Sequence, residues 1–125
     1  MGKRRFHKNE LRLPVYNTVR QLYEQFCKST RKLPINIKRG PVAEAELWMI
    51  ELLEVICFAD DCGENEKEQK LALIRKCEDL IYKIMIRVRT LRNLNLIPIS
   101  GFSALIRIEK SVNCQLDGWL EHNND

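Results

Sequence analysis

The sequence predicts an all-α protein, and more specifically an antiparallel, up-down-up-down four-helix bundle. The chain has only five glycines and four prolines among 125 residues, the two residue types that most disfavour helix. Four segments carry apolar residues at spacings of three and four, and the connections between them are short. We expect one domain at residues 13–122, after a basic flexible arm at 1–12 and before a frayed tail at 123–125.

The first helix is expected over about residues 15–31, followed by a basic connection. Its single apolar stripe consists of Val15, Val19, Leu22 and Phe26. Leu33-Pro34 ends the helix, because the residue before a proline avoids helical angles. Residues 35–40 then form the connection, and Pro41 suits the first turn of the next helix.

The second helix, which is expected to end near Asp61, has apolar residues on two sides. Its core face consists of Ala45, Trp48, Leu52, Val55, Ile56 and Ala59. Its other side mixes apolar and acidic residues: Leu47, Ile50, Glu51, Glu54, Cys57 and Phe58. A helix of this kind must bury more than one surface.

The third helix is expected at residues 66–93, with Asn65 as its N-cap. Its core stripe is Leu73, Cys77, Leu80, Ile81, Ile84, Val88 and Leu91. Tyr82 and Ile86 are four residues apart and lie away from that stripe.

The fourth helix is expected at residues 101–122, capped by Ser100. Its stripe is Phe102, Leu105, Ile106, Val112, Leu116, Trp119 and Leu120, with Glu109 at its edge.

Charge is divided into blocks along the chain. Residues 1–43 contain eleven Lys or Arg and two acids, whereas residues 44–68 contain nine acids and one base. Residues 80–108 contain five bases and no acid. Blocks of opposite sign indicate either binding of a polyanion or electrostatic docking between copies of the chain.

The bases therefore predict a surface for nucleic acid or a polymerase, although a solvated charged face remains the alternative. Lys76, Lys83 and Arg87 fall on one line of the third helix, whereas Arg89 and Arg92 point elsewhere. The full set of predicted binding residues is Arg31, Lys32, Lys38, Arg39, Lys76, Lys83, Arg87, Arg89 and Arg92. No aromatic residue is interleaved with these bases in the sequence, so we expect contacts mainly to the nucleic-acid backbone.

The second apolar side of the second helix predicts a contact between subunits, with scattered surface hydrophobes as the alternative. The predicted interface consists of Leu47, Ile50, Glu51, Glu54, Phe58, Tyr82 and Ile86. Acids of this helix, including Glu44, would meet bases of a neighbouring copy. A contact between unlike patches closes into a ring if the rotation permits.

Catalysis has little support in the sequence. The chain has two histidines, no phosphate-binding glycine loop and no metal-ligand spacing, so we expect no cofactor, no metal and no enzymatic activity. Five irregularly spaced cysteines indicate free thiols in a reducing cytoplasm, and no segment is apolar enough to cross a membrane. Two alternatives stay open: a protein-interaction bundle without a nucleic-acid role, and a small-molecule-binding bundle or enzyme that uses the thiols.

Three short motifs carry a family resemblance over residues 15–122. They are Arg31-Lys32-Leu33-Pro34, the segment Arg89-Thr90-Leu91-Arg92-Asn93-Leu94-Asn95-Leu96-Ile97, and Leu116-Asp117-Gly118-Trp119-Leu120. In this order and spacing the chain resembles the four-helix-bundle proteins related to Avd, the accessory variability determinant of diversity-generating retroelements. The wider group includes bundles encoded in intervening sequences of ribosomal RNA genes.

The resemblance implies a basic, ring-shaped homopentamer that partners a reverse transcriptase and its template RNA, or the complementary DNA, during mutagenic retrohoming. By position, Lys83, Arg87, Arg89 and Arg92 would help to hold the RNA or the polymerase. Trp119 would pack where the last helix meets the first connection. The family often has two glycines before this tryptophan, and here Asp117 replaces the first of them.

Overall fold

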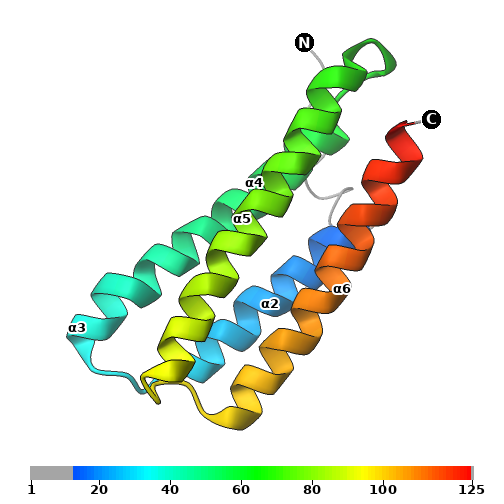
Figure 1. Cartoon of the computed structure of the whole chain (residues 1–125). Helices are drawn as coiled ribbons and strands as arrows, with labels where there is room; N and C mark the ends of the chain where they lie inside the picture. Colours follow the sequence, from blue (N-terminus) through cyan, green and yellow to red (C-terminus); the bar gives the residue numbers. More distant parts are fainter. Residues whose placement is uncertain (1–12, 125) are drawn as a thin grey trace.

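The computed structural model describes residues 13–124, and this part of the chain is helical with no strand. Its elements are α2 (Pro14–Thr30), α3 (Ile35–Ile37), η1 (Lys38–Val42), α4 (Ala43–Asp60), η2 (Glu64–Glu66), α5 (Lys67–Asn93) and α6 (Ile99–Asn124). The predicted all-α class with four main helices is confirmed (Figure 1). The basic arm expected at 1–12 lies outside the described residues.

Each long helix contacts two neighbours, in the order α2, α4, α5, α6 and back to α2. Consecutive long helices run in opposite directions (Figure 1). Side-chain pairs agree with this course, since Glu44 at the start of α4 is paired with Arg87 near the end of α5. The arrangement closes with α6 against α2, where Gly101 lies beside Ser29.

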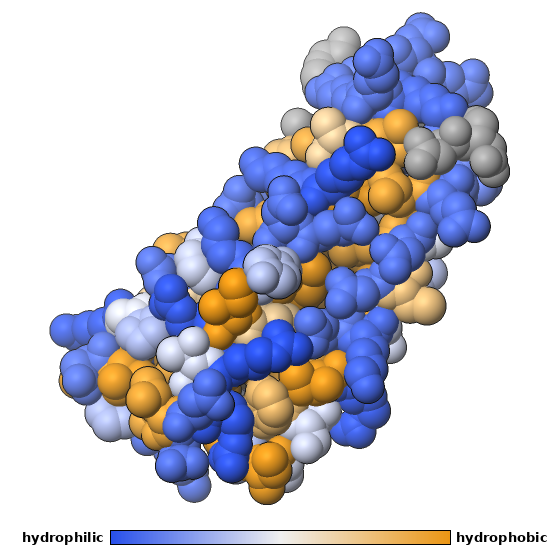
Figure 2. Space-filling view, viewed as in Figure 1, coloured by the Kyte–Doolittle hydropathy of each residue, from blue (hydrophilic) through white to orange (hydrophobic). Residues whose placement is uncertain are grey.

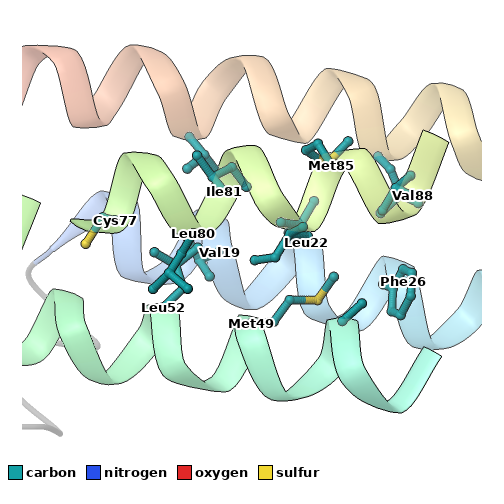
Figure 3. Packing of buried hydrophobic residues seen from close by; sticks show 14 of the residues in the cluster. Val19, Leu22, Phe26, Met49, Leu52, Cys77, Leu80, Ile81, Met85 and Val88 are labelled. Atoms are coloured by element: carbon teal, nitrogen blue, oxygen red, sulfur yellow. The ribbon is translucent and has the colours of Figure 1, made fainter. Parts of the chain in front are cut away.

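The core runs along the bundle and contains buried residues of every long helix. Figure 3 shows the part of it where side chains of α2, α4 and α5 meet. All four residues of the α2 stripe are buried, as predicted. On α6, Leu105, Val112 and Leu116 are buried, whereas Phe102, Ile106, Trp119 and Leu120 only pack against the core edge.

On α4 and α5 the buried arc is wider than the predicted stripes. Met49, Ile74 and Met85 are fully buried although the stripes omitted them. Cys57 was placed on the outer side of its helix, but it is only 2% exposed. Trp48 and Leu73 were predicted to be core residues, and they are half-buried. Helices α4 and α5 share the most extensive contact of any helix pair, and each also packs against a further helix, so they bury residues on both sides of a single stripe.

The connection predicted at residues 35–40 is instead helical. The chain turns at Leu33 and Pro34, forms α3, and continues through the wider π-turns of η1 into α4. Gly40 departs from helical geometry inside η1, with φ −99° and ψ −105°. Pro41 follows it within η1, and proline lacks the N–H that a regular helical turn requires. Pro41 therefore lies at a kink rather than in the first turn of a new helix.

The other two connections differ from the predicted caps. Asn65 lies inside η2 and does not cap α5; the stabilising contact is the Gly63 backbone N–H donating to the Glu66 carboxylate at 2.8 Å. Helix α6 begins one residue before Ser100, which is therefore part of the first turn and not its cap. The expected tail also differs, because α6 continues to Asn124 and the Asn123 amide donates to the Trp119 carbonyl at 2.8 Å.

Helix α5 ends in a Schellman motif that redirects the chain into α6. Asn95 has φ 61°, in the left-handed region that asparagine tolerates better than most residues. The Leu96 N–H donates to the Leu91 carbonyl and the Asn95 N–H to the Arg92 carbonyl, both at 2.9 Å. These bonds satisfy carbonyls that the end of a helix leaves open.

Trp119 does not lie where the family resemblance implied. The ammonium of Lys70, near the start of α5, is 5.9 Å from the centre of the Trp119 ring. This is the end of the bundle opposite to the α2–α3 connection (Figure 1). A Cβ at Gly118 would meet nothing within 4 Å, so no tight helix contact depends on this glycine. Among the described residues, no helix has the length and apolar character that crossing a membrane would require.

Candidate nucleic-acid interface

Lys76, Lys83 and Arg87 share one face of α5, as predicted, and this face is turned toward α4. Lys76 Nζ lies 3.5 Å from the Glu51 carboxylate, and Arg87 forms an ion pair with Glu44. Although residues 80–108 contain no acid, acids of the neighbouring helix therefore pair with two of these three bases. We call this surface the α4–α5 seam: Glu44, Trp48, Glu51, Lys76, Lys83 and Arg87.

Trp48 lies at the centre of the seam, beneath two cations. Lys83 Nζ is 4.8 Å and Arg87 Cζ is 5.1 Å from the centre of the ring. Both distances fall within the range of cation–π attraction. An aromatic residue is therefore interleaved with the bases in space, although the linear sequence gave no such pattern. The sequence feature that could have placed Trp48 among the bases is the short connection at residues 61–66, because it makes α4 and α5 pack side by side.

Arg89 and Arg92 are not part of the seam, and both have structural partners. The Arg89 guanidinium lies 3.2 Å from the Glu109 carboxylate of α6. Arg92 donates a hydrogen bond of 2.8 Å to the Ile97 carbonyl, across the turn that the Schellman motif begins. Arg92 therefore holds the α5–α6 connection, and Arg89 joins α5 to α6.

The least compensated positive charge gathers at one end of the bundle, which we call the basic end: Arg31, Lys32, Lys38, Arg39 and Arg92. The connections after α2 and after α5 meet there, as the contact of Gly101 with Ser29 shows (Figure 1). Lys38 donates to the Arg31 carbonyl at 3.1 Å and keeps its charge. Within residues 13–124, no carboxylate forms an ion pair with the exposed Arg31, Lys32 or Arg39.

The sequence explains why the basic end has so little acid. No Asp or Glu occurs between Glu24 and Glu44, or between Asp79 and Glu109. These two acid-free segments include both connections at this end. Positive charge that is not neutralised locally attracts a polyanion over roughly 8–10 Å at moderate salt.

The apolar residues assigned to a subunit interface are exposed, as the sequence predicted. The relative exposures are 66% for Leu47, 40% for Ile50, 38% for Phe58, 71% for Tyr82 and 48% for Ile86. Figure 2 shows apolar side chains interspersed with polar ones on the side of the molecule that presents α5. Glu44 and Glu51 differ from their predicted role, because each is paired with a base of its own chain.

These exposed residues form two groups on either side of the seam. The outer α4 stripe consists of Leu47, Ile50, Glu54 and Phe58, and the outer α5 pair consists of Tyr82 and Ile86. Tyr82 and Ile86 come directly before Lys83 and Arg87, whose side chains reach α4. One residue along a helix corresponds to a rotation of about 100° about its axis. The outer α5 pair is thus turned away from α4, and by the same reasoning Leu47 is turned away from Trp48 and α5.

The thiols give no support to nucleophilic chemistry. Burial raises the pKa of Cys77 to about 12. Burial, and then the charge of Glu46, raises the pKa of Cys27, whose thiol donates to Glu46 at 3.5 Å in a groove of about 510 Å³ between α2 and α4. Reactive cysteines instead have lowered pKa values. In the described part of the chain all five cysteines are free, and no three His, Cys, Asp or Glu residues are grouped to hold a metal ion.

No family model matches this chain, and no curated protein matches it either. We therefore infer function from the charge distribution, the seam and the three motifs that resemble Avd-like proteins.

Proposed function

We propose that this protein is a non-enzymatic accessory subunit that binds nucleic acid and associates with a retroelement reverse transcriptase and its template RNA or complementary DNA during mutagenic retrohoming. Its scaffold is an antiparallel, up-down-up-down four-helix bundle of the Avd-like type. It works in a reducing cytoplasm, in keeping with its free thiols. The protein contributes by positioning a polyanion and not by bond chemistry.

The observation that carries this proposal is the basic end. Phosphate binding needs clustered Lys and Arg whose charges are available. Arg31, Lys32 and Arg39 are exposed and unpaired with acids of residues 13–124, whereas Lys76, Arg87 and Arg89 are paired within the chain. The basic end is therefore the main site of phosphate contact, and the α4–α5 seam is secondary. Contacts of this kind position a strand and do not read its sequence.

The proposed assembly is a ring of identical subunits, a homopentamer by the family resemblance. The outer α4 stripe of one copy packs against the outer α5 pair of the next. Exposed apolar side chains that recur along one helix face support such a contact. Because the two groups are unlike and lie on either side of the seam, the contact is heterologous and leaves the seam uncovered.

The test is RNA binding followed by fluorescence anisotropy, with a labelled 20-nucleotide RNA at 50–300 mM salt. Replacing Arg31, Lys32 and Arg39 with Glu should weaken binding by about tenfold or more, because the variant loses three phosphate contacts. The slope of log affinity against log salt should fall by about 2, since each contact contributes about 0.7 for single strands.

A matched control carries the same charge change elsewhere. Arg75, Arg107 and Lys110 are exposed and lie outside both the basic end and the seam. Their replacement by Glu should weaken binding by less than about threefold. Equal losses in the two variants would contradict the assignment of the basic end. Absence of RNA binding at 50 mM salt would contradict the whole proposal and favour a protein-interaction bundle, for which the exposed apolar residues are the supporting observation.

A further inference from the structure

Trp48 has an aromatic ring at the surface of the α4–α5 helix pair, beneath two cations of α5. The side chain is half-buried: it packs against the core edge from α4 and lies under Lys83 and Arg87. Both side chains that cover the ring, Lys83 and Arg87, are charged and not apolar. The ring is therefore shielded by two charged side chains, each of which is also a phosphate ligand by chemistry.

The two cations are held to different degrees. Arg87 is half-buried and forms an ion pair with Glu44. Lys83 is exposed, and within residues 13–124 it forms no ion pair. Its ammonium, on a flexible four-carbon stem, can leave the ring at the cost of one exposed cation–π contact. Lys83 is thus a movable cover over the ring, whereas Arg87 is a fixed one.

A nucleotide offers both the Lys83 ammonium and the Trp48 ring a better partner. Its phosphate attracts the Lys83 ammonium, and its base has a flat face that stacks on an aromatic ring. At exposed sites, the attraction of a cation to a ring is weaker than the stacking of a base on it. One nucleotide can therefore exchange the Lys83–Trp48 contact for two contacts, one at its phosphate and one at its base.

We propose that Trp48 stacks a nucleobase and gives this protein a preference for single-stranded nucleic acid. The proposal rests on the proposed function and adds the class of strand. In a duplex each base is covered by its neighbours in the stack, so a duplex reaches the basic end but not Trp48. The preference tolerates any sequence, because every base has a π-face.

The position of Trp48 suits a strand already held at the basic end. Arg39 and Trp48 are nine residues apart along the helical path from η1 into α4. The α-helical part of this path, from Ala43 to Trp48, is five residues long, or roughly 8 Å along the axis at 1.5 Å per residue. A strand bound at the basic end therefore has to continue for only a few nucleotides along the seam to reach the ring.

The chain offers a direct readout, because it contains only two tryptophans. In the Trp119→Phe variant, Trp48 is the sole source of tryptophan emission, and the stacking residue itself is intact. We would titrate this variant with a 12-nucleotide uridine RNA and with a 12-base-pair RNA duplex, and record tryptophan emission and the anisotropy of a labelled probe together. We expect saturable quenching by the single strand, and anisotropy without quenching for the duplex.

A second variant measures the contribution to affinity. Trp48→Leu should bind the single strand about tenfold more weakly and the duplex unchanged, while Trp48→Phe, which keeps a ring, should lose about threefold or less. The unchanged duplex affinity also shows that the Leu variant is folded. If it does not fold, the emission of Trp119→Phe decides the question alone.

The outcomes separate this inference from the function on which it rests. Binding of the single strand with unchanged Trp48 emission would overturn the stacking and leave the phosphate-binding role of the basic end intact. Equal quenching by the single strand and the duplex would overturn the strand preference. Absence of an anisotropy change with both RNAs would overturn the stacking and the proposed function together.

Discussion

Replacing Gly101 with alanine is expected to destabilise the bundle at the end where its two connections meet. Gly101 lies in the first turn of α6, against the last turn of α2. A Cβ atom at this position would lie 2.5 Å from Ser29 Oγ and 3.2 Å from Ser29 Cβ. Both distances are shorter than ordinary van der Waals contact, so Ser29 or the helices themselves must move.

The size of the effect follows from what has to move. Ser29 Oγ can rotate away from the new methyl group, but it then gives up the 3.0 Å hydrogen bond that it accepts from Gln25, worth about 0.5–1.5 kcal/mol. The contact with Ser29 Cβ remains, and relieving it separates α2 and α6 slightly, at a further cost within the usual 1–3 kcal/mol of overpacking. Alanine's better helix propensity offsets about 0.5–1 kcal/mol. The expected net loss is about 1–3 kcal/mol.

The assay is urea unfolding followed by circular dichroism at 222 nm. Gly118→Ala is the matched control, because it lies in the same helix with nothing within 4 Å of its Cβ, and it should stabilise the protein by about 0.5–1 kcal/mol. Adding Ser29→Gly to Gly101→Ala removes both close atoms and should recover about 1 kcal/mol. If Gly101→Ala raises stability as much as Gly118→Ala, the close approach of α2 and α6 is refuted.

Two further predictions concern a carboxylate pair and the proposed ring. Burial raises the pKa of Glu78, and the hydrogen bond and charge of Asp117 raise it further. The folded state therefore binds more protons at Glu78 than the unfolded state does. Stability falls as pH rises from the ordinary glutamate pKa through the pKa in the folded state. Glu78→Gln should therefore be more stable than the natural chain in urea unfolding, by about 0.3 kcal/mol at pH 7, and should gain nothing near pH 4. Equal gains at both pH values would contradict this. For the ring, light scattering should give a pentameric mass that Leu47→Glu reduces to that of a monomer, while Ile35→Glu, an equally exposed apolar residue at the basic end, leaves it unchanged. A monomeric natural chain would refute the assembly.

The helices and most of the core could be predicted from the sequence, because both depend on local periodicity. The stripe of α2 is a simple case: its residues recur at helical spacing, and α2 has one apolar side to bury. Cys57 was misplaced because α4 shares the most extensive helix contact with α5 and also packs against α2, so a single stripe underestimates the arc that it buries. The kink at Gly40 was missed because proline is tolerated both in a first turn and at a π-turn.

The candidate site was only partly predictable, because its partners come from different helices. The spacing of Lys76, Lys83 and Arg87 correctly placed them on one line of α5. Their pairing with Glu44 and Glu51, and their position over Trp48, depend on the register between α4 and α5, which local spacing does not give. Conversely, Arg31, Lys32 and Arg39 have an available charge because two acid-free segments, far apart in the chain, meet at the same end.

The pairing of α4 with α5 has a consequence for how the molecule is made. These two helices are consecutive and joined by a short connection, so their contacts close small loops, and such local contacts form fastest in folding. The seam, the outer α4 stripe and the outer α5 pair all belong to this helical hairpin. During synthesis the hairpin leaves the ribosome before α6, which then covers its buried side together with α2. The seam and the two surfaces proposed for subunit contact are thus built by one contiguous stretch of chain, unlike the basic end, and changes in α2 or α6 reach them only through the core.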